Sequence, residues 1–499
     1  MFLCYNQSIY RNLYWQVAII MVSFVISLVV LVLGYFLYGR LTEKVFGPDD
    51  RKTPAIAIND GVDCVPIKTW KALLIQLLNI AGTGPIFGAL MGACFGPVVF
   101  LWIVFGSILG GAVHDYMRGM ISERNNGASI AELSGIYLGK PALYVMRVFS
   151  VLLLLLTGTV FVNSPATLLA DLTDNAVSTG IWIVIILVYY VLATLLPIDK
   201  VIGRFYPVFG VILIVMALSI AGGIMLLPQY EVPEVSLSNL NPTGLPIWPF
   251  MFITVACGAI SGFHATQSPM MAKCITSEKE GRKVFYGAML IESVIALIWA
   301  AAGVAFYGST QMLQGALTDL GQSGVVYDIS TNMLGRFGGA LAIIGVVVCP
   351  ITSGDTAFRS ARLILAEWTK LDQKKIRSRL IITVPLLGVS AILTQIDFNI
   401  LWRYFSWSNQ TLATIALWVC TAYLIKSGRK HVYLLLTAMP ATFMTAVSVT
   451  YIIIADEGFR LPEEVGYLTG IAVALAMFVN FVTMYVKHNK VHVRRRRGK

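Results

Sequence analysis

The sequence is built from apolar blocks of about 20 residues that are separated by short polar segments. A helix of that length spans the hydrocarbon core of a bilayer. Hydrophobic residues make up 57% of the 499 residues, and charged residues only 13%, against about 25% in soluble domains. The chain is therefore expected to be an all-α polytopic membrane protein, and a water-soluble enzyme with one large core is excluded.

Apolar runs bounded by charged, Gly/Pro or Asn/Asp clusters predict thirteen transmembrane helices. They cover residues 16–38, 71–92, 95–117, 142–164, 178–197, 203–227, 247–270, 285–307, 336–360, 379–396, 400–425, 431–454 and 464–486. The first run is too long for the core of a signal peptide, and its positive flank follows it, so we expect it to remain as a helix.

Basic residues alternate between the connecting segments. Of the 37 Lys and Arg residues, 32 fall in the alternate segments 40–71, 118–140, 198–204, 273–283, 359–379, 426–430 and the tail from 487. Because cytoplasmic loops retain Lys and Arg, this pattern predicts an external N-terminus and a cytoplasmic C-terminus. It also explains the net charge of +11 without nucleic acid, and the cluster at 494–497 is expected to contact anionic lipid.

Two predicted helices are interrupted by glycine and proline, at 79–85 (NIAGTGP) and 257–269 (CGAISGFHATQSP). Proline cannot donate a helical N–H and glycine favours unwinding. Backbone N–H and C=O groups that lose their helical partners at membrane depth are tolerated only where they contact protein or line a polar cavity. The alternative is an ordinary kink with small residues for helix packing.

Each interruption lies in the first helix of a set of five predicted helices. The charge pattern orients the two sets in opposite directions. We therefore expect residues 1–70 to form an extra helix and a cytoplasmic loop, 71–227 and 247–425 two inverted five-helix repeats, and 426–499 two accessory helices with a basic tail. Paired interruptions of this kind indicate the substrate site of a secondary transporter. The expected substrate-binding residues are Gly82, Thr83, Gly84, Pro85, Gly258, Ser261, Gly262 and His264.

Ionisable side chains inside apolar blocks are costly and usually functional. Glu292 has no other charged residue within eight positions, which suggests proton carriage or a buried gate, against a structural carboxyl group. His264 suits proton coupling, because imidazole titrates near neutral pH, although a lone histidine is more often a structural donor.

Asp355 stands among the hydroxyl residues Thr352, Ser353 and Thr356. Such a set of oxygen atoms suits a small cation such as Na⁺. A salt bridge from Asp355 to a following arginine explains the pattern equally well.

Two further segments are candidates for gates. His114, Asp115 and Arg118 open a stretch of mixed charge, 114–132, that suits an inner gate or a solvated loop with local ion pairs. Arg403 is the only basic residue of the aromatic segment 402–410, which suits an interfacial belt or a clamp for a carboxylate.

Enzyme chemistry and cofactors are not expected. The seven cysteines form no CxxC pair, and no histidine follows them at zinc spacing, so we expect neither disulfides nor a metal site apart from Na⁺ at Asp355. No nucleophile–base pair stands out either.

Segments 79–88, 114–132, 261–269, 353–356 and 402–410 closely resemble the carbon starvation protein A (CstA) family of bacterial inner-membrane transporters, within a similarity over about residues 70–425. The resemblance implies uptake of pyruvate or small peptides during nutrient starvation, and a five-plus-five inverted-repeat fold of the LeuT-like, APC type. It implies that both interruptions lie where this fold holds substrate. It also places Asp355 on the helix that carries sodium ligands in the sodium symporters of the fold. This chain has only two helices after the second repeat, fewer than many members.

Together these observations predict proton-coupled import of pyruvate through the cytoplasmic membrane, with Glu292 as the first candidate for the proton carrier. The N-terminal ends of the half-helices after Gly84 and Gly262 would hold the carboxylate. Peptide import and sodium coupling remain alternatives. An ion channel is less favoured, because an inverted repeat does not form a symmetric pore lining.

Overall fold

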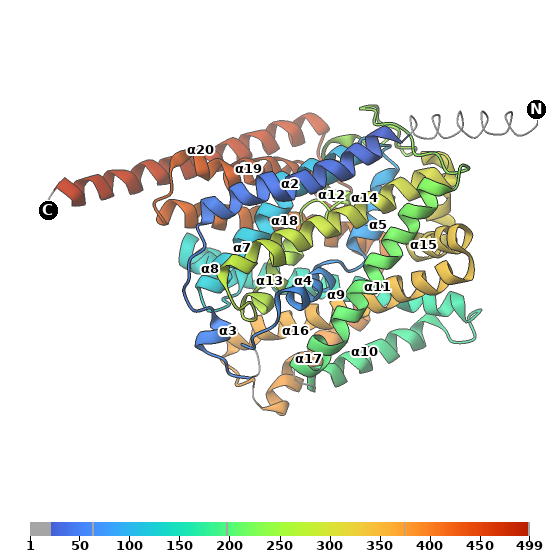
Figure 1. Ribbon diagram of the computed structural model, residues 1–499, viewed down its shortest axis with the longest axis horizontal. Coiled ribbons are helices and arrows are strands. Elements are labelled where there is room, and N and C mark those ends of the chain that lie inside the picture. The colour runs from blue at the N-terminus through green and yellow to red at the C-terminus, as the bar shows by residue number, and fades with distance from the viewer. Residues whose placement is uncertain (1–20, 62–63, 196–197, 374, 498–499) are drawn as a thin grey trace, which may run out of the picture.

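The structure is a computed structural model that describes residues 21–61, 64–195, 198–373 and 375–497. These residues form helices and connecting turns and contain no β-strand (Figure 1). Residues 16–20 of the first predicted helix lie outside the described residues. The all-α fold class predicted from the sequence is confirmed.

The helices follow one another along the chain with short connections. They are α2 (Val22–Phe46), α3 (Pro54–Ala57), α4 (Thr69–Ile80), α5 (Gly84–Ala93), α6 (Val99–Leu101), the π-helical η1 (Trp102–Gly111), α7 (Ala112–Arg124), α8 (Ile130–Leu138), α9 (Lys140–Leu172), α10 (Thr179–Leu195), α11 (Ile198–Leu226), η2 (Ile247–Met251), α12 (Phe252–Thr254), α13 (Gly262–Ala272), η3 (Glu278–Glu280), η4 (Arg282–Tyr286), α14 (Gly287–Tyr307), α15 (Thr310–Ile343), η5 (Ile344–Val348), α16 (Cys349–Thr369), α17 (Ile376–Leu393), α18 (Phe398–Lys426), α19 (His431–Ile454) and α20 (Glu463–Arg497).

Eight helices of the described chain are long and apolar enough to cross a membrane, or up to ten if each of two bent pairs forms one span. The chain is therefore a multi-pass membrane protein. Thirteen spans, the division into two inverted repeats and the orientation of the termini stay predictions.

Two predicted connections are largely helical. Residues 308–335 were expected to form a loop, but most of them belong to α15, which bends at Gly321 and Gly335, two glycines with positive φ. This helix buries Leu313, Val325 and Ile329, but polar residues and glycines interrupt its apolar residues, so they form no continuous block. The expected loop 118–140 likewise contains the end of α7 and all of α8.

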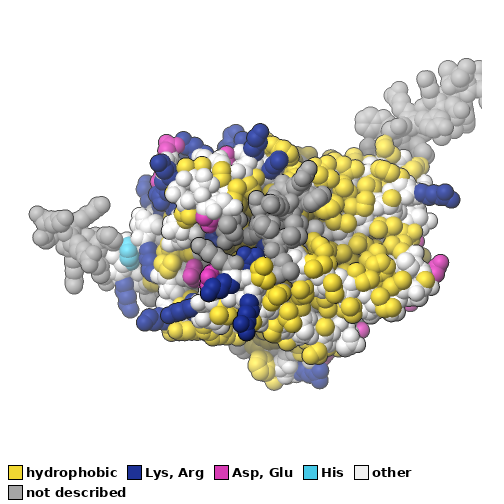
Figure 2. All heavy atoms as spheres, turned by 90° about the horizontal axis from the view of Figure 1, so that it is seen from below, with side chains coloured by type: hydrophobic (Ala, Val, Ile, Leu, Met, Phe, Trp, Pro, Cys, Tyr) yellow, Lys and Arg dark blue, Asp and Glu magenta, His cyan; other side chains and the backbone are white. Residues whose placement is uncertain are grey.

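The broken helices lie inside the bundle. In Figure 1, α2, α19 and α20 follow one edge of the molecule, and α10 and α17 follow the opposite edge. Between them α5 packs against α14, and α13 packs against α4, α7 and α18. Figure 2 shows Lys and Arg gathered mainly at one end of the viewed face, beside a broad hydrophobic surface. We call this the basic end.

Candidate functional site

The first interruption separates α4 from α5, whose axes differ by 52°. Pro85 lies in the first turn of α5, where a missing N–H costs nothing. Around this break, Gln76, Asn79 and Thr83 are almost completely buried, and their side-chain polar atoms have no hydrogen-bond partner. Buried polar groups are normally paired. These three side chains therefore have polar atoms that remain able to pair with a ligand.

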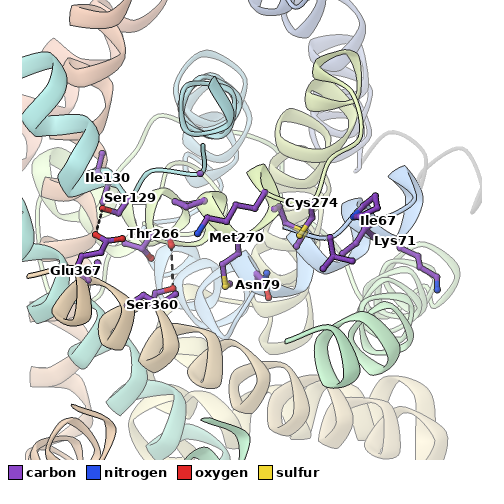
Figure 3. Close-up of a pocket in the computed structure, with 18 of the residues that line it drawn as sticks. Ile67, Lys71, Asn79, Ser129, Ile130, Thr266, Met270, Cys274, Ser360 and Glu367 are labelled. Carbon is purple, nitrogen blue, oxygen red and sulfur yellow. Dashed lines mark hydrogen bonds between the residues drawn. The ribbon is translucent and has the colours of Figure 1, made fainter. Parts of the chain in front are cut away.

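A cavity of about 300 Å³ lies beside the first break, where Asn79 lines it. Its walls come from α4, α8, α13, α16 and the adjoining turns, and Figure 3 shows Asn79 beside Met270 in its lining. Ser129 Oγ donates to Glu367 Oε2 (3.3 Å) and Ser360 Oγ to the carbonyl oxygen of Thr266 (3.5 Å). The polar side chains of the wall are those of Lys68, Lys71, Asn79, Ser129, Thr266, Lys273, Ser360 and Glu367.

The second interruption lies between α12 and α13. Gly258 has φ +90°, a conformation that glycine adopts without strain, and Ser261 is extended. Asn409 of α18 caps the start of α13, because its Oδ1 accepts from the Phe263 N–H (2.6 Å) and from Ser261 Oγ (3.1 Å). In this conformation the Phe263 N–H is therefore already paired and does not face a ligand.

The two interruptions touch each other. A Cβ atom added to Gly84 would lie 2.4 Å from Cys257 Sγ, and one added to Gly258 would lie 3.8 Å from Pro85 Cα and 2.4 Å from Ala296 Cβ. Only glycine allows the backbones to approach this closely. The expected substrate-binding glycines thus lie together, but much of the space beside them is filled by protein.

Four ionisable side chains form a buried chain across α7, α13 and α14. Asp115 Oδ1 lies 2.8 Å from His114 Nδ1, and Asp115 Oδ2 lies 2.8 Å from His264 Nδ1. His264 Nε2 lies 3.3 Å from Glu292 Oε2. All four side chains are fully buried. Because a carboxylate accepts from both rings, each imidazole is assigned the tautomer with a proton on Nδ1.

Glu292 is not isolated in the fold, although no charged residue lies near it in the sequence. Its Oε2 faces His264 Nε2. A lone pair on His264 Nε2 and an ionised Glu292 would repel each other, so a proton shared between these two atoms stabilises the contact.

Cys257 belongs to the same place, although the sequence did not indicate it. The thiol sulfur of Cys257, a ring nitrogen of His264 and a carboxylate oxygen of Glu292 lie within 4.8 Å of one another. The cysteine comes from the second break and the glutamate from α14, so spacing along the chain did not reveal the group.

Asp355 forms a separate buried group on α16. Its Oδ2 lies 3.5 Å from an Arg359 nitrogen and accepts from Tyr206 at 3.5 Å, as the salt-bridge alternative predicted. The hydroxyl groups of Thr352, Ser353 and Thr356 donate to the carbonyl oxygens of Cys349, Leu78 and Ser353, respectively. Their lone pairs remain, so sodium binding there stays a prediction.

The predicted gate residues fall in two different environments. His114, Asp115 and Arg118 are buried in α7, so the alternative of a solvated loop is wrong for them. The Arg118 guanidinium has no hydrogen-bond partner in the described chain. Arg403 is half-exposed near the start of α18, with Nε 3.5 Å from Glu457 Oε2, and is not part of the buried chain.

Comparison with known proteins shows relatives that cover most of the chain. The peptide transporter CstA of Bacillus subtilis is 24% identical, over 91% of this chain and 94% of that protein. An uncharacterized membrane protein of Haemophilus influenzae is 43% identical over 350 residues, 60% of this chain and 94% of that protein. The pyruvate/proton symporter BtsT of Escherichia coli is 29% identical over 331 residues, 53% of this chain and 46% of that protein.

Solved transporters share the fold at low sequence identity. MhsT in complex with L-phenylalanine has a TM-score of 0.53 at 15% identity, over 84% of this chain and 98% of its own. The manganese transporter of Eremococcus coleocola has a TM-score of 0.52 at 12% identity, over 88% of this chain and 99% of its own. These likenesses show a LeuT-like transporter fold. The family model described as carbon starvation protein CstA matches residues 18–181, 171–317 and 311–451, and the chain belongs to this family of membrane transporters.

Proposed function

We propose that this protein is a secondary active transporter that imports pyruvate together with a proton during carbon starvation. The observation that carries the proposal is the cavity that Lys68, Lys71 and Lys273 line together with Asn79, whose buried amide has no hydrogen-bond partner in the described chain. A cavity of about 300 Å³ lies at the lower end of the range of ligand sites, which suits a small metabolite.

The charges around the cavity favour an anion. Lys68, Lys71 and Lys273 line it, and such positive charges raise the local concentration of an anionic substrate. At the first break the Asn79 amide, which lines the cavity, can donate to a carboxylate. The predicted substrate residues Gly82 to Pro85, Gly258, Ser261, Gly262 and His264 stay part of the proposed site because the two breaks touch.

Proton coupling is supported by one relative, BtsT, whose name states pyruvate/proton symport. Symport of one proton neutralises a monocarboxylate, and a further proton would add about 2.3 kcal/mol per 100 mV of membrane potential. Glu292 and His264 stay the proposed carriers, and the oxygen atoms around Asp355 stay the alternative, for sodium. His114, Asp115, Arg118 and Arg403 stay proposed gate residues.

The proposal also places the protein in the cytoplasmic membrane of a bacterium. The basic end faces the cytoplasm, because loops rich in Lys and Arg are retained there. The cavity is then the cytoplasmic half of the transport route, the N-terminus is outside and the C-terminus inside.

Replacement of Asn79 tests the proposed site. In the purified protein, pyruvate should raise the unfolding temperature of the wild type, because a ligand that binds only the folded state stabilises it. Asn79→Leu should remove this shift, whereas Asn332→Leu, at an exposed position on α15, should keep it. A full shift in Asn79→Leu would contradict the proposed site, and no shift in the wild type would contradict pyruvate as the cargo.

Small peptides are a second candidate, which Glu367 favours. Its carboxyl group lines the same cavity as the lysines, so the wall offers partners for both ends of a zwitterion. A relative named as a peptide transporter aligns with most of the chain. A dipeptide that stabilises the wild type in place of pyruvate would support this candidate.

A further inference from the structure

We propose that Cys257, His264 and Glu292 form a binding site for a borderline divalent cation of the Zn²⁺ class. The three side chains are almost completely buried, and their ligand-type atoms lie within 4.8 Å of one another. Apart from their contact with each other, His264 Nε2 and both oxygens of Glu292 have no hydrogen-bond partner in the described chain. The ligand atoms thus converge on one point inside the membrane domain.

The separation of the atoms suits a metal ion. Zinc binds nitrogen and oxygen at about 2.0–2.1 Å and sulfur at about 2.3 Å, so the edges of a tetrahedral site measure about 3.3–3.6 Å. His264 Nε2 and Glu292 Oε2 are 3.3 Å apart. Small side-chain rotations would bring the thiol of Cys257 to the third corner, and the fourth corner is left for water, as in open zinc sites.

The surrounding residues already hold the ligands in place. Asp115 Oδ2 accepts from His264 Nδ1 (2.8 Å), which leaves the Nε2 lone pair for a metal. Asn409 Nδ2 lies 3.6 Å from Cys257 Sγ and can donate to a thiolate there. Zinc-binding histidines usually carry such a carboxylate partner on the other ring nitrogen.

The chemistry of the ligands selects the class of ion. A thiolate and an imidazole favour Zn²⁺, Co²⁺ or a similar ion, whereas Mg²⁺ and Ca²⁺ prefer oxygen atoms only. With a neutral imidazole, the thiolate and the carboxylate balance the two positive charges, so the bound site is neutral inside the low-dielectric core. Binding releases the thiol proton and the proton shared by His264 and Glu292.

Such an ion would link the second break to α14. Cys257 and His264 flank the irregular backbone at Gly258, and Glu292 lies within a continuous helix. The site does not depend on the identity of the cargo. Its occupation would fix the broken segment, so we expect it to inhibit transport.

Cobalt is a suitable probe, because Co²⁺ bound to a thiolate gives a charge-transfer band in the near ultraviolet. The untagged full chain in detergent is titrated with Co²⁺, and Zn²⁺ is then added. We expect one equivalent of Co²⁺ to give this band together with tetrahedral d–d absorption, and Zn²⁺ to remove both. Cys257→Ser should lose the band, whereas Cys94→Ser, at another buried cysteine, should keep it.

Asp115→Asn provides a second measurement. This variant keeps all three ligands, so the band should remain, but the affinity for Co²⁺ should fall about 10- to 100-fold, because the supporting carboxylate is lost. Unfolding curves without metal report whether each variant is folded. A wild type without the band, or a band that persists in Cys257→Ser, would overturn the proposal. Neither result bears on pyruvate uptake, which is measured separately.

Discussion

Asn409 joins two distant parts of the molecule through one side chain. Its oxygen accepts from the Phe263 N–H and from Ser261, so α18 caps the start of α13. Asn409→Ala leaves a buried N–H without an acceptor, which costs about 1–3 kcal/mol. We expect the free energy of unfolding in detergent to fall by that amount.

Asn332→Ala is the matched control for Asn409→Ala, because this asparagine is exposed on α15. It should change the free energy of unfolding by less than about 0.5 kcal/mol. Equal stability of Asn409→Ala and the wild type would show that the cap is not needed.

At the scale of helices, the contact between α13 and α18 depends on Gly262. A Cβ atom there would lie 2.3 Å from the carbonyl oxygen of Asn409 and 2.5 Å from the Ala413 nitrogen. Both are backbone atoms of a long helix, so the two helices must separate. Gly262→Ala is therefore expected to lower the unfolding free energy by about 1–3 kcal/mol, as other overpacked substitutions do.

Gly222→Ala tests the same substitution where there is room. Gly222 lies in α11 and has no neighbouring atom within 4 Å of an added Cβ. Alanine there should leave stability unchanged or raise it by up to about 1 kcal/mol, because alanine favours the helix. Alanine favours the helix at both positions, so a loss at Gly222 as large as that at Gly262 would contradict close packing as the cause of the loss at Gly262.

The helices themselves show what the sequence can predict. Blocks of apolar residues located most spans, and glycine located both breaks, because these signals are local. Proline marks only the first break: the second was predicted to extend to Pro269, but that proline lies inside α13, so this part of the prediction is wrong. The helix α15 was missed because polar residues and glycines interrupt its apolar residues. The contacts of Cys257 with Glu292 and of Asn409 with Phe263 were also missed, since they depend on how distant segments pack.

At the scale of the whole molecule, the breaks, the buried acid–imidazole chain and the cavity lie on adjacent helices. Thr266 lines the cavity two residues after His264, and Asn79 lines it beside the first break. A cargo in this cavity would therefore lie close to the proposed ion carriers. This proximity is what a coupled transporter needs, because occupation of one site must change the balance between two states of the other.

Uptake of labelled pyruvate into proteoliposomes tests this account most directly. We predict that an imposed pH gradient, acidic outside, drives accumulation without sodium, and that a protonophore abolishes it. Protein-free liposomes correct for passive entry of pyruvic acid. Accumulation that follows a sodium gradient at equal pH, and that is lost in Asp355→Asn, would contradict proton coupling and assign the coupling ion to the α16 oxygen atoms.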